Sequence, residues 1–95
     1  MNSRISGAFR LRERPLIVTC VVAGDPSFAE SIQISRELVD AGADMIEIVM
    51  PFSDPVADGP VIQQAGSRAR AAGMTTERLF DLVREIRRET TIPLL

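Results

Sequence analysis

One carboxylate stands where it could move protons. Glu47 interrupts the apolar run MIEIVM, residues 45–50. An ionised carboxylate buried in such a run is costly unless it is paired. Burial would favour the neutral acid and raise its pKa toward values that suit proton transfer near neutral pH. The alternative is a structural glutamate bonded to a backbone amide or to an arginine, and the pattern alone favours neither role.

Two further carboxylates follow directly along the chain. Asp54 and Asp58 lie in the proline-rich segment PFSDPVADG, residues 51–59. Aspartates beside proline or glycine are common in turns, which is the favoured interpretation of this segment taken alone. A pair of loop carboxylates can also hold Mg²⁺. A buried Glu47 and a more polar Asp58 could instead divide acid and base roles between them.

Few other side chains in the sequence could act as nucleophiles or metal ligands. The chain has one cysteine, Cys20, and no histidine. This excludes an internal disulfide and a His/Cys zinc site, and it leaves the thiol without an activating imidazole. Cys20 lies in an apolar run and is predicted to pack rather than to react. No glycine-rich phosphate loop is present, and we expect solvated helix faces at arginines 68, 70, 84, 87 and 88.

The composition and the net charge argue against some classes of binding partner. Of the 95 residues, 45% are hydrophobic and 25% are charged, which is ordinary for a soluble globular chain. The net charge of −2 provides no basic field for nucleic acid or anionic lipid. No apolar run approaches a membrane span, and the arginine-rich start lacks a signal-peptide core. We therefore expect a cytoplasmic protein with neither nucleic-acid nor membrane partners.

The elements that must position these residues alternate along the chain. A short amphipathic helix is predicted between residues 2 and 14, ended by Pro15. Residues 16–23, LIVTCVVA, predict a strand buried on both faces, as in parallel sheets. A helix over residues 28–41 follows, with Ser27 as its N-cap and Gly42 as its stop. Residues 45–50 then form a second buried strand.

Two consecutive helices are predicted next. Pro60 suits the first turn of a helix that packs Val61, Ile62 and two alanines inward and stops at Gly73. Another helix begins at Thr75 or Thr76, with a clean apolar stripe at residues 79, 82, 83 and 86. Residues 91–95, TIPLL, begin a third apolar run.

This order predicts an α/β fold, because strand–helix–strand crossovers imply parallel pairing with right-handed connections. A (β/α)8 TIM barrel needs about 250 residues, so 95 are a little over a third of one. We therefore interpret residues 1–95 as the N-terminal portion of a single barrel domain. It would hold about three βα units after an N-terminal helix.

Three segments carry a resemblance to a known family. The longest is AGADMIEIVMPFSDPVADGPVIQQA, residues 41–65, which has VVAGDP upstream at 21–26 and RARAAGMT downstream at 68–75. Together they closely resemble the tryptophan synthase alpha subunit family, over essentially the whole chain. The resemblance implies a TIM-barrel lyase of tryptophan biosynthesis. It would cleave indole-3-glycerol phosphate by a retro-aldol reaction to indole and glyceraldehyde 3-phosphate, without cofactor or metal.

The resemblance also assigns roles to two residues. The family's strand glutamate falls on Glu47, which would move protons at the indole C3 and at the glycerol hydroxyl. The family's loop aspartate falls on Asp58, which would accept a hydrogen bond from the indole N–H and stabilise the cationic indolenine. This is coherent chemistry, since C–C cleavage needs C3 protonated and the resulting cation needs an anion nearby.

The family passes indole to a beta subunit in an alpha2beta2 heterotetramer. By resemblance, Asp54 and Pro55 are contacts to that subunit. Three substrate-pocket positions depart from the common pattern: Cys20 replaces a large aromatic, Val22 a frequent threonine, and Val49 a frequent glycine. They change the expected shape of the indole pocket and leave the two carboxylates in place.

Two alternatives remain beside the alpha-chain interpretation. One is another barrel lyase or isomerase acting on a sugar phosphate, against which the PFSDPVADGP loop argues. The other is a truncated, non-catalytic product that persists as a binding fragment. Whichever holds, the 95-residue chain by itself is expected to be inactive, because the late phosphate-binding loops of the family are absent from it.

Overall fold

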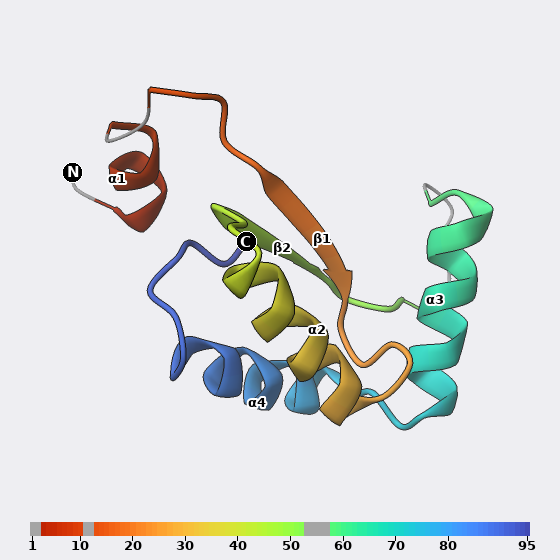
Figure 1. Ribbon diagram of the computed structural model, residues 1–95. Coiled ribbons are helices and arrows are strands. Elements are labelled where there is room, and N and C mark those ends of the chain that lie inside the picture. Colours follow the sequence, from red (N-terminus) through yellow and green to blue (C-terminus); the bar gives the residue numbers. More distant parts are fainter. Residues whose placement is uncertain (1–2, 11–12, 53–57) are drawn as a thin grey trace.

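The computed structural model describes residues 3–10, 13–52 and 58–95, and the element order predicted from the sequence is confirmed (Figure 1). Four helices and two strands follow one another within these ranges: α1 Arg4–Arg10, β1 Val18–Val22, α2 Phe28–Asp40, β2 Met45–Val49, α3 Pro60–Ala71 and α4 Thr76–Arg87.

The strands pair in parallel, as the crossover through α2 requires. In the register of β1 and β2, Cys20 lies opposite Glu47. The predicted third apolar run joins the other edge of β2, where Ile46 N–H donates to the Pro93 carbonyl at 3.1 Å and Leu95 N–H donates to the Ile46 carbonyl at 2.9 Å. β2 is therefore central, with β1 on one side and residues 93–95 on the other. This is the strand order of an α/β barrel built in sequence.

Local signals set the helix ends. The Ser27 hydroxyl accepts the Glu30 N–H at 3.2 Å, and the Thr75 hydroxyl accepts the Arg78 N–H at 3.2 Å. Each bond satisfies an N–H that the first turn of a helix leaves unpaired. After α2 and α3 the chain turns at glycines with positive φ, +103° at Gly42 and +97° at Gly73. Side chains rarely adopt that conformation.

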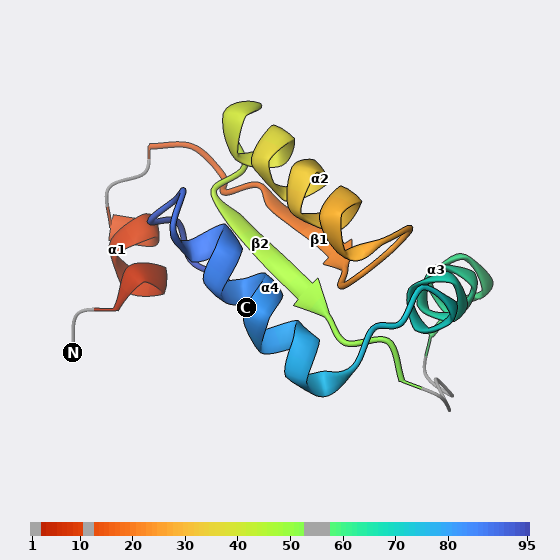
Figure 2. The ribbon, with the colours of Figure 1, turned by 90° about the horizontal axis from the view of Figure 1, so that it is seen from below.

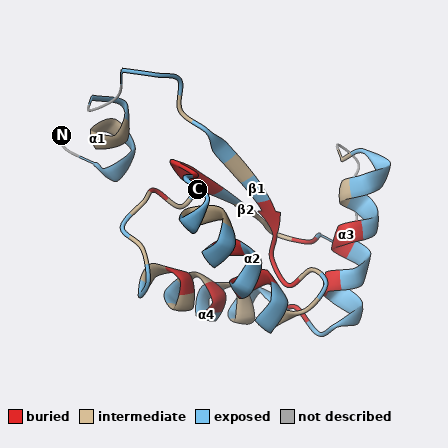
Figure 3. Ribbon diagram, in the orientation of Figure 1, coloured by how far each residue is buried: buried red, intermediate tan, exposed pale blue. Residues whose placement is uncertain are grey.

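The core lies on one side of the sheet. α2 and α4 both lie against this side and contact each other (Figures 1 and 2). α3 stands at the carboxyl end of the strands. Ile32, Leu82 and Ile86 are buried between these elements, together with the alanine face of α3 (Figure 3). That face is the i, i+3, i+7 series Ile62, Ala65, Ala69, so the predicted inward position of Val61 is wrong, and it is exposed.

The other side of the sheet is uncovered by the described helices. Ile17 is 54% exposed and Val18 is 47% exposed, whereas Val21 and Val22 at the far end of β1 are buried. The prediction that residues 16–23 are buried on both faces is therefore wrong for the first half of the run. Side chains alternate between the faces of a strand, so Ile17 and Val18 project to opposite sides, and the start of the run lacks cover on both.

The N-terminal helix forms but buries nothing. α1 is shorter than the predicted helix, no residue of it is buried, and Phe9 is 61% exposed. It lies near the amino ends of the strands, which is the end opposite to α3 (Figure 1). Its position agrees with a helix at the floor of the barrel.

A buried aspartate ties the starts of the two strands together. The Asp44 side chain is fully buried and accepts the Ile17 N–H at 2.8 Å. The Arg14 guanidinium donates to both of its carboxylate oxygens, at 3.1 and 3.3 Å. Paired and hydrogen-bonded in this way, the charge can stay buried. Asp44 thus fixes the register that sets Cys20 beside Glu47.

Candidate active site

Glu47 lies on the uncovered side of the sheet. As in-register neighbours of parallel strands, Glu47 and Cys20 project from the same face. Both residues are exposed. The predictions that Glu47 is buried and that Cys20 packs inside the chain are therefore wrong. The middle of this face is open to solvent, although Met45 and Val22, which project from the same face at its two ends, are buried.

Asp58 reaches the same site from the loop before α3. It is half-buried and lines a small hollow at the carboxyl ends of the strands. Val22 from the end of β1, Val49 from the end of β2 and Ile62 from α3 form apolar walls of this hollow. These three apolar side chains thus form a surface next to the Asp58 carboxylate. A flat apolar ring with one polar N–H would need this arrangement.

Electrostatics connect the three predicted residues. Partial burial raises the pKa of the Cys20 thiol above its ordinary value, and the negative charges of Glu47 and then Asp58 raise it further. The thiol therefore stays protonated near neutral pH, which makes it a poor nucleophile. Glu47 and Asp58 thus form one negatively charged site around Cys20.

We expect the reactivity of Cys20 to report this field. The pH midpoint of iodoacetamide alkylation of Cys20 should lie above that of a free thiol. Glu47→Gln and Asp58→Asn should each lower it, because each removes a charge that opposes thiolate formation. The rate would be followed by mass spectrometry across a pH series, with Glu77→Gln on α4 as the matched control. If neither substitution moves the midpoint, the charges of Glu47 and Asp58 do not act on the Cys20 thiol, and the prediction is wrong.

The predicted contacts Asp54 and Pro55 lie outside the described residues. The Mg²⁺ alternative, which needs Asp54, remains untested for the same reason. Within the described ranges, no three histidine, cysteine, aspartate or glutamate residues gather in a way that could hold a metal ion.

An ion pair joins the loop after β1 to α3. The Arg68 guanidinium donates to both carboxylate oxygens of Asp25, at 2.8 and 3.1 Å. Arg68 was predicted to lie on a solvated helix face, and its side chain is half-exposed, but it also links α3 to the loop after β1. Nothing in the sequence pairs residues 25 and 68, which lie 43 positions apart.

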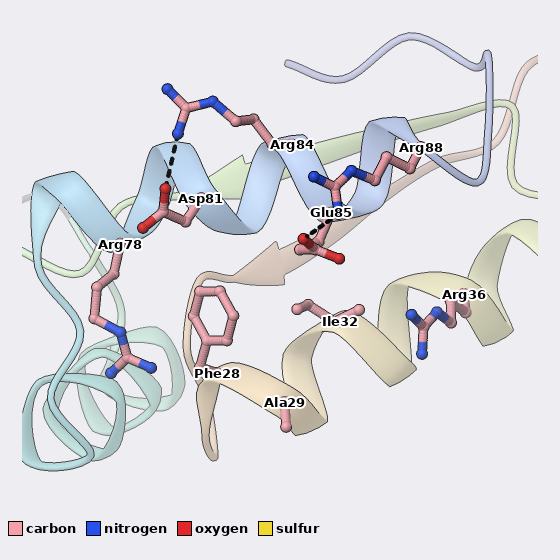
Figure 4. Close-up of a pocket in the computed structure, with 9 residues that line it drawn as sticks. All are labelled: Phe28, Ala29, Ile32, Arg36, Arg78, Asp81, Arg84, Glu85 and Arg88. Atoms are coloured by element: carbon pink, nitrogen blue, oxygen red, sulfur yellow. Dashed lines mark hydrogen bonds and ion pairs between the residues drawn. The ribbon is translucent and has the colours of Figure 1, made fainter.

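A wide surface groove lies between α2 and α4, and neither Glu47 nor Asp58 lines it (Figure 4). Its charges are matched locally, as in the pairs Arg84–Asp81 and Arg88–Glu85. At one end the Arg78 guanidinium lies 4.6 Å from the centre of the Phe28 ring. The groove is a solvated surface feature between two helices.

No helix in the described part of the chain has the length and apolar character needed to cross a membrane.

Sequence comparison places these features in a family. The profile of the tryptophan synthase alpha chain family matches residues 8–95. The tryptophan synthase alpha chain of Methanothermobacter thermautotrophicus is 51% identical over 86 residues, which are 90% of this chain and 32% of that protein. The Methanoregula boonei alpha chain is 42% identical over 95 residues, which are 100% of this chain and 36% of that protein. The chain thus spans about a third of the length of these relatives.

Solved structures agree. The alpha subunit of tryptophan synthase from Legionella pneumophila superposes with a TM-score of 0.92 at 33% identity, over 99% of this chain and 37% of that one. A chain of the tryptophan synthase complex from Pyrococcus furiosus superposes with a TM-score of 0.78 at 35% identity, over 83% of this chain and 32% of that one. The predicted fold class, part of an α/β barrel, is confirmed. The chain belongs to the tryptophan synthase alpha chain family.

Proposed function

We propose that this chain supplies the acid–base carboxylate and the cation-stabilising carboxylate of a lyase in tryptophan biosynthesis. The reaction is the retro-aldol cleavage of indole-3-glycerol phosphate to indole and glyceraldehyde 3-phosphate. The observation that carries the proposal is that the negative charges of Glu47, in the middle of β2, and of Asp58, in the loop before α3, both act on Cys20. Asp58 lines the hollow at the carboxyl ends of the strands, the end that carries the chemistry in α/β barrels.

The division of labour follows from the needs of the reaction. Glu47 delivers a proton to the indole C3 and takes one from the glycerol hydroxyl, so that the C–C bond breaks while proton transfer balances. Asp58 accepts the indole N–H and opposes the positive charge that C3 protonation creates. Val22 and Val49 give the apolar walls against which the ring lies. No cofactor or metal is needed for these steps.

The product needs a partner. Indole is apolar and diffuses away easily, so we propose transfer to a beta subunit in an alpha2beta2 assembly, with Asp54 and Pro55 as contacts. The similar Pyrococcus furiosus chain comes from a tryptophan synthase complex. We place this reaction in the cytoplasm, on the sequence argument given above.

The test is an indole-release assay on a complete barrel. Residues 1–95 would be joined to the remaining two thirds of the Methanothermobacter thermautotrophicus relative, and we call this protein the joined barrel. It should release indole from indole-3-glycerol phosphate, and faster with a beta subunit present. A folded joined barrel that releases none, while the unmodified relative does, would contradict the proposal.

Asp58→Asn in the joined barrel should lower the turnover number by about 10² to 10³, the usual cost of one preorganised electrostatic partner. Asparagine keeps the size of the side chain and a hydrogen-bond acceptor but removes the charge opposite the cation. Steady-state kinetics would measure the loss, with Asp81→Asn on α4 as the matched control. Unchanged turnover combined with lost Mg²⁺ binding would instead support the metal interpretation of the loop.

A further inference from the structure

Asp58 has a backbone support that comes from one side chain of α3. The Nε2 atom of Gln63 donates to the Asp58 carbonyl at 2.7 Å. The backbone N–H of Gln63 donates to the Gly59 carbonyl at 3.0 Å, which closes the first turn of the helix. One residue therefore holds two successive carbonyls, those of the candidate catalytic residue and of its neighbour.

Among the described residues, Gln63 is the one whose side chain bonds the chain that enters this helix. Gly59 occupies the N-cap position and makes no side-chain cap hydrogen bond, and Pro60 contributes no N–H. At the starts of α2 and α4, by contrast, the hydroxyls of Ser27 and Thr75 fix the entering chain. At α3, the Gln63 side-chain amide instead donates to a backbone carbonyl, that of Asp58, just before the helix.

The support is itself anchored. One turn beyond Gln63, the helix backbone at Gly66 lies beside Pro51, the buried residue that follows β2, and a Cβ at Gly66 would make an ordinary packing contact of 3.6 Å with the Pro51 ring. Ala65 and Ala69 of the same helix lie in the core. α3 therefore packs in a fixed position against the end of β2. The Gln63 hydrogen bond holds the Asp58 backbone in a fixed position relative to that helix.

We propose that Gln63 is a positioning residue for Asp58 in the reaction proposed above, on which this inference rests. Its hydrogen bond restricts the Asp58–Gly59 peptide plane, and with it the ψ angle that sets where the Asp58 carboxylate points. A misplacement of about 1 Å at a reacting centre can cost about 10²-fold in rate. The bond therefore acts on turnover through the position of Asp58.

Two variants and a matched control test this. Gln63→Met keeps the length of the side chain and removes the donor. Gln63→Glu keeps its shape and puts an acceptor oxygen in place of the amide. Gln64→Met changes the next residue, an exposed glutamine of the same helix, and serves as the control.

The first measurement is the ¹⁵N order parameter of the Gly59 N–H, which belongs to the same peptide plane as the Asp58 carbonyl. In the joined barrel it should fall from a rigid value of about 0.85 to below about 0.6 in Gln63→Met and Gln63→Glu, and stay rigid in Gln64→Met. An unchanged order parameter in both Gln63 variants would overturn the proposal, whatever the chain catalyses.

The second measurement is kinetic, in the joined barrel. Both Gln63 variants should lower kcat by about 10- to 100-fold with KM within about threefold, whereas Gln64→Met should match the parent. A merely structural role would lower the melting temperature and leave kcat per folded molecule unchanged, and that outcome also overturns the proposal. An inactive parent with the expected loss of order at Gly59 would count against the proposed function alone.

Discussion

Glu47→Gln in the joined barrel is expected to nearly abolish indole release while the fold stays intact. The side chain lies in the middle of β2, beside Cys20 in the register and on the face that carries the site. Glutamine keeps the length and planarity of the side chain but cannot take up or deliver the proton that C–C cleavage requires. General acid–base catalysis alone is worth about 10² to 10⁴ in rate, and Glu47 would serve at two positions of the substrate.

Initial rates of indole release and a circular dichroism melt would be measured on the same preparation. Glu77→Gln on the exposed face of α4 is the matched control, since it removes one negative charge far along the chain from the site. If Glu47→Gln kept cleavage within about tenfold of the parent, about 1.4 kcal/mol in the barrier, Glu47 would be a structural residue.

The helices and their order could be predicted from the sequence because their signals are local. Ser27 and Thr75 act on N–H groups three residues further along, and Gly42 and Gly73 supply a backbone conformation at a single position. The parallel pairing followed from the length of the crossover between the strands. None of these inferences needs knowledge of residues that are distant along the chain.

Burial was the part that could not be predicted. The apolar runs around Cys20 and Glu47 show that these strands suit a covered environment, but a pattern does not say whether the cover is present. In this chain α2 and α4 cover one face, and Val18 and Glu47 on the other face are exposed, as is Ile17 just before β1. The desolvation argued for Glu47 from its neighbours in sequence therefore has no counterpart in the structure.

The sequence pointed to the two carboxylates of the candidate site, Glu47 and Asp58. It did not point to the residues that hold the surrounding backbone in place. A charge inside an apolar run and an aspartate in a proline-rich loop can be seen in one sequence. Gln63 and the Asp25–Arg68 pair cannot, because a polar residue on a helix ordinarily faces water and its partner is set by the tertiary fold. For Asp44 a signal existed, an acidic residue directly before an apolar strand, but only the structure shows that it joins Ile17 and Arg14.

The 95-residue chain by itself is expected to release no indole above the blank. Among the described residues, nothing pairs with the outer edges of β1 and of residues 93–95, and Glu47 is exposed to water. The indole ring would then have no opposing wall, and positioning of reactants can supply about 7–11 kcal/mol of a rate enhancement. The substrate phosphate would also need a binding site before its binding energy could assist the reaction at the reacting carbon.

The same open face predicts how the isolated chain behaves in solution. Exposed apolar side chains such as Ile17 and Val18 beside unpaired edges favour association with other strands. Light scattering should therefore show self-association or aggregation. Addition of the remaining two thirds of the Methanothermobacter thermautotrophicus relative as a separate chain should reduce it and restore measurable indole release. A stable, monomeric and active 95-residue chain would contradict this, because Glu47 and Asp58 would then need no opposing wall to act.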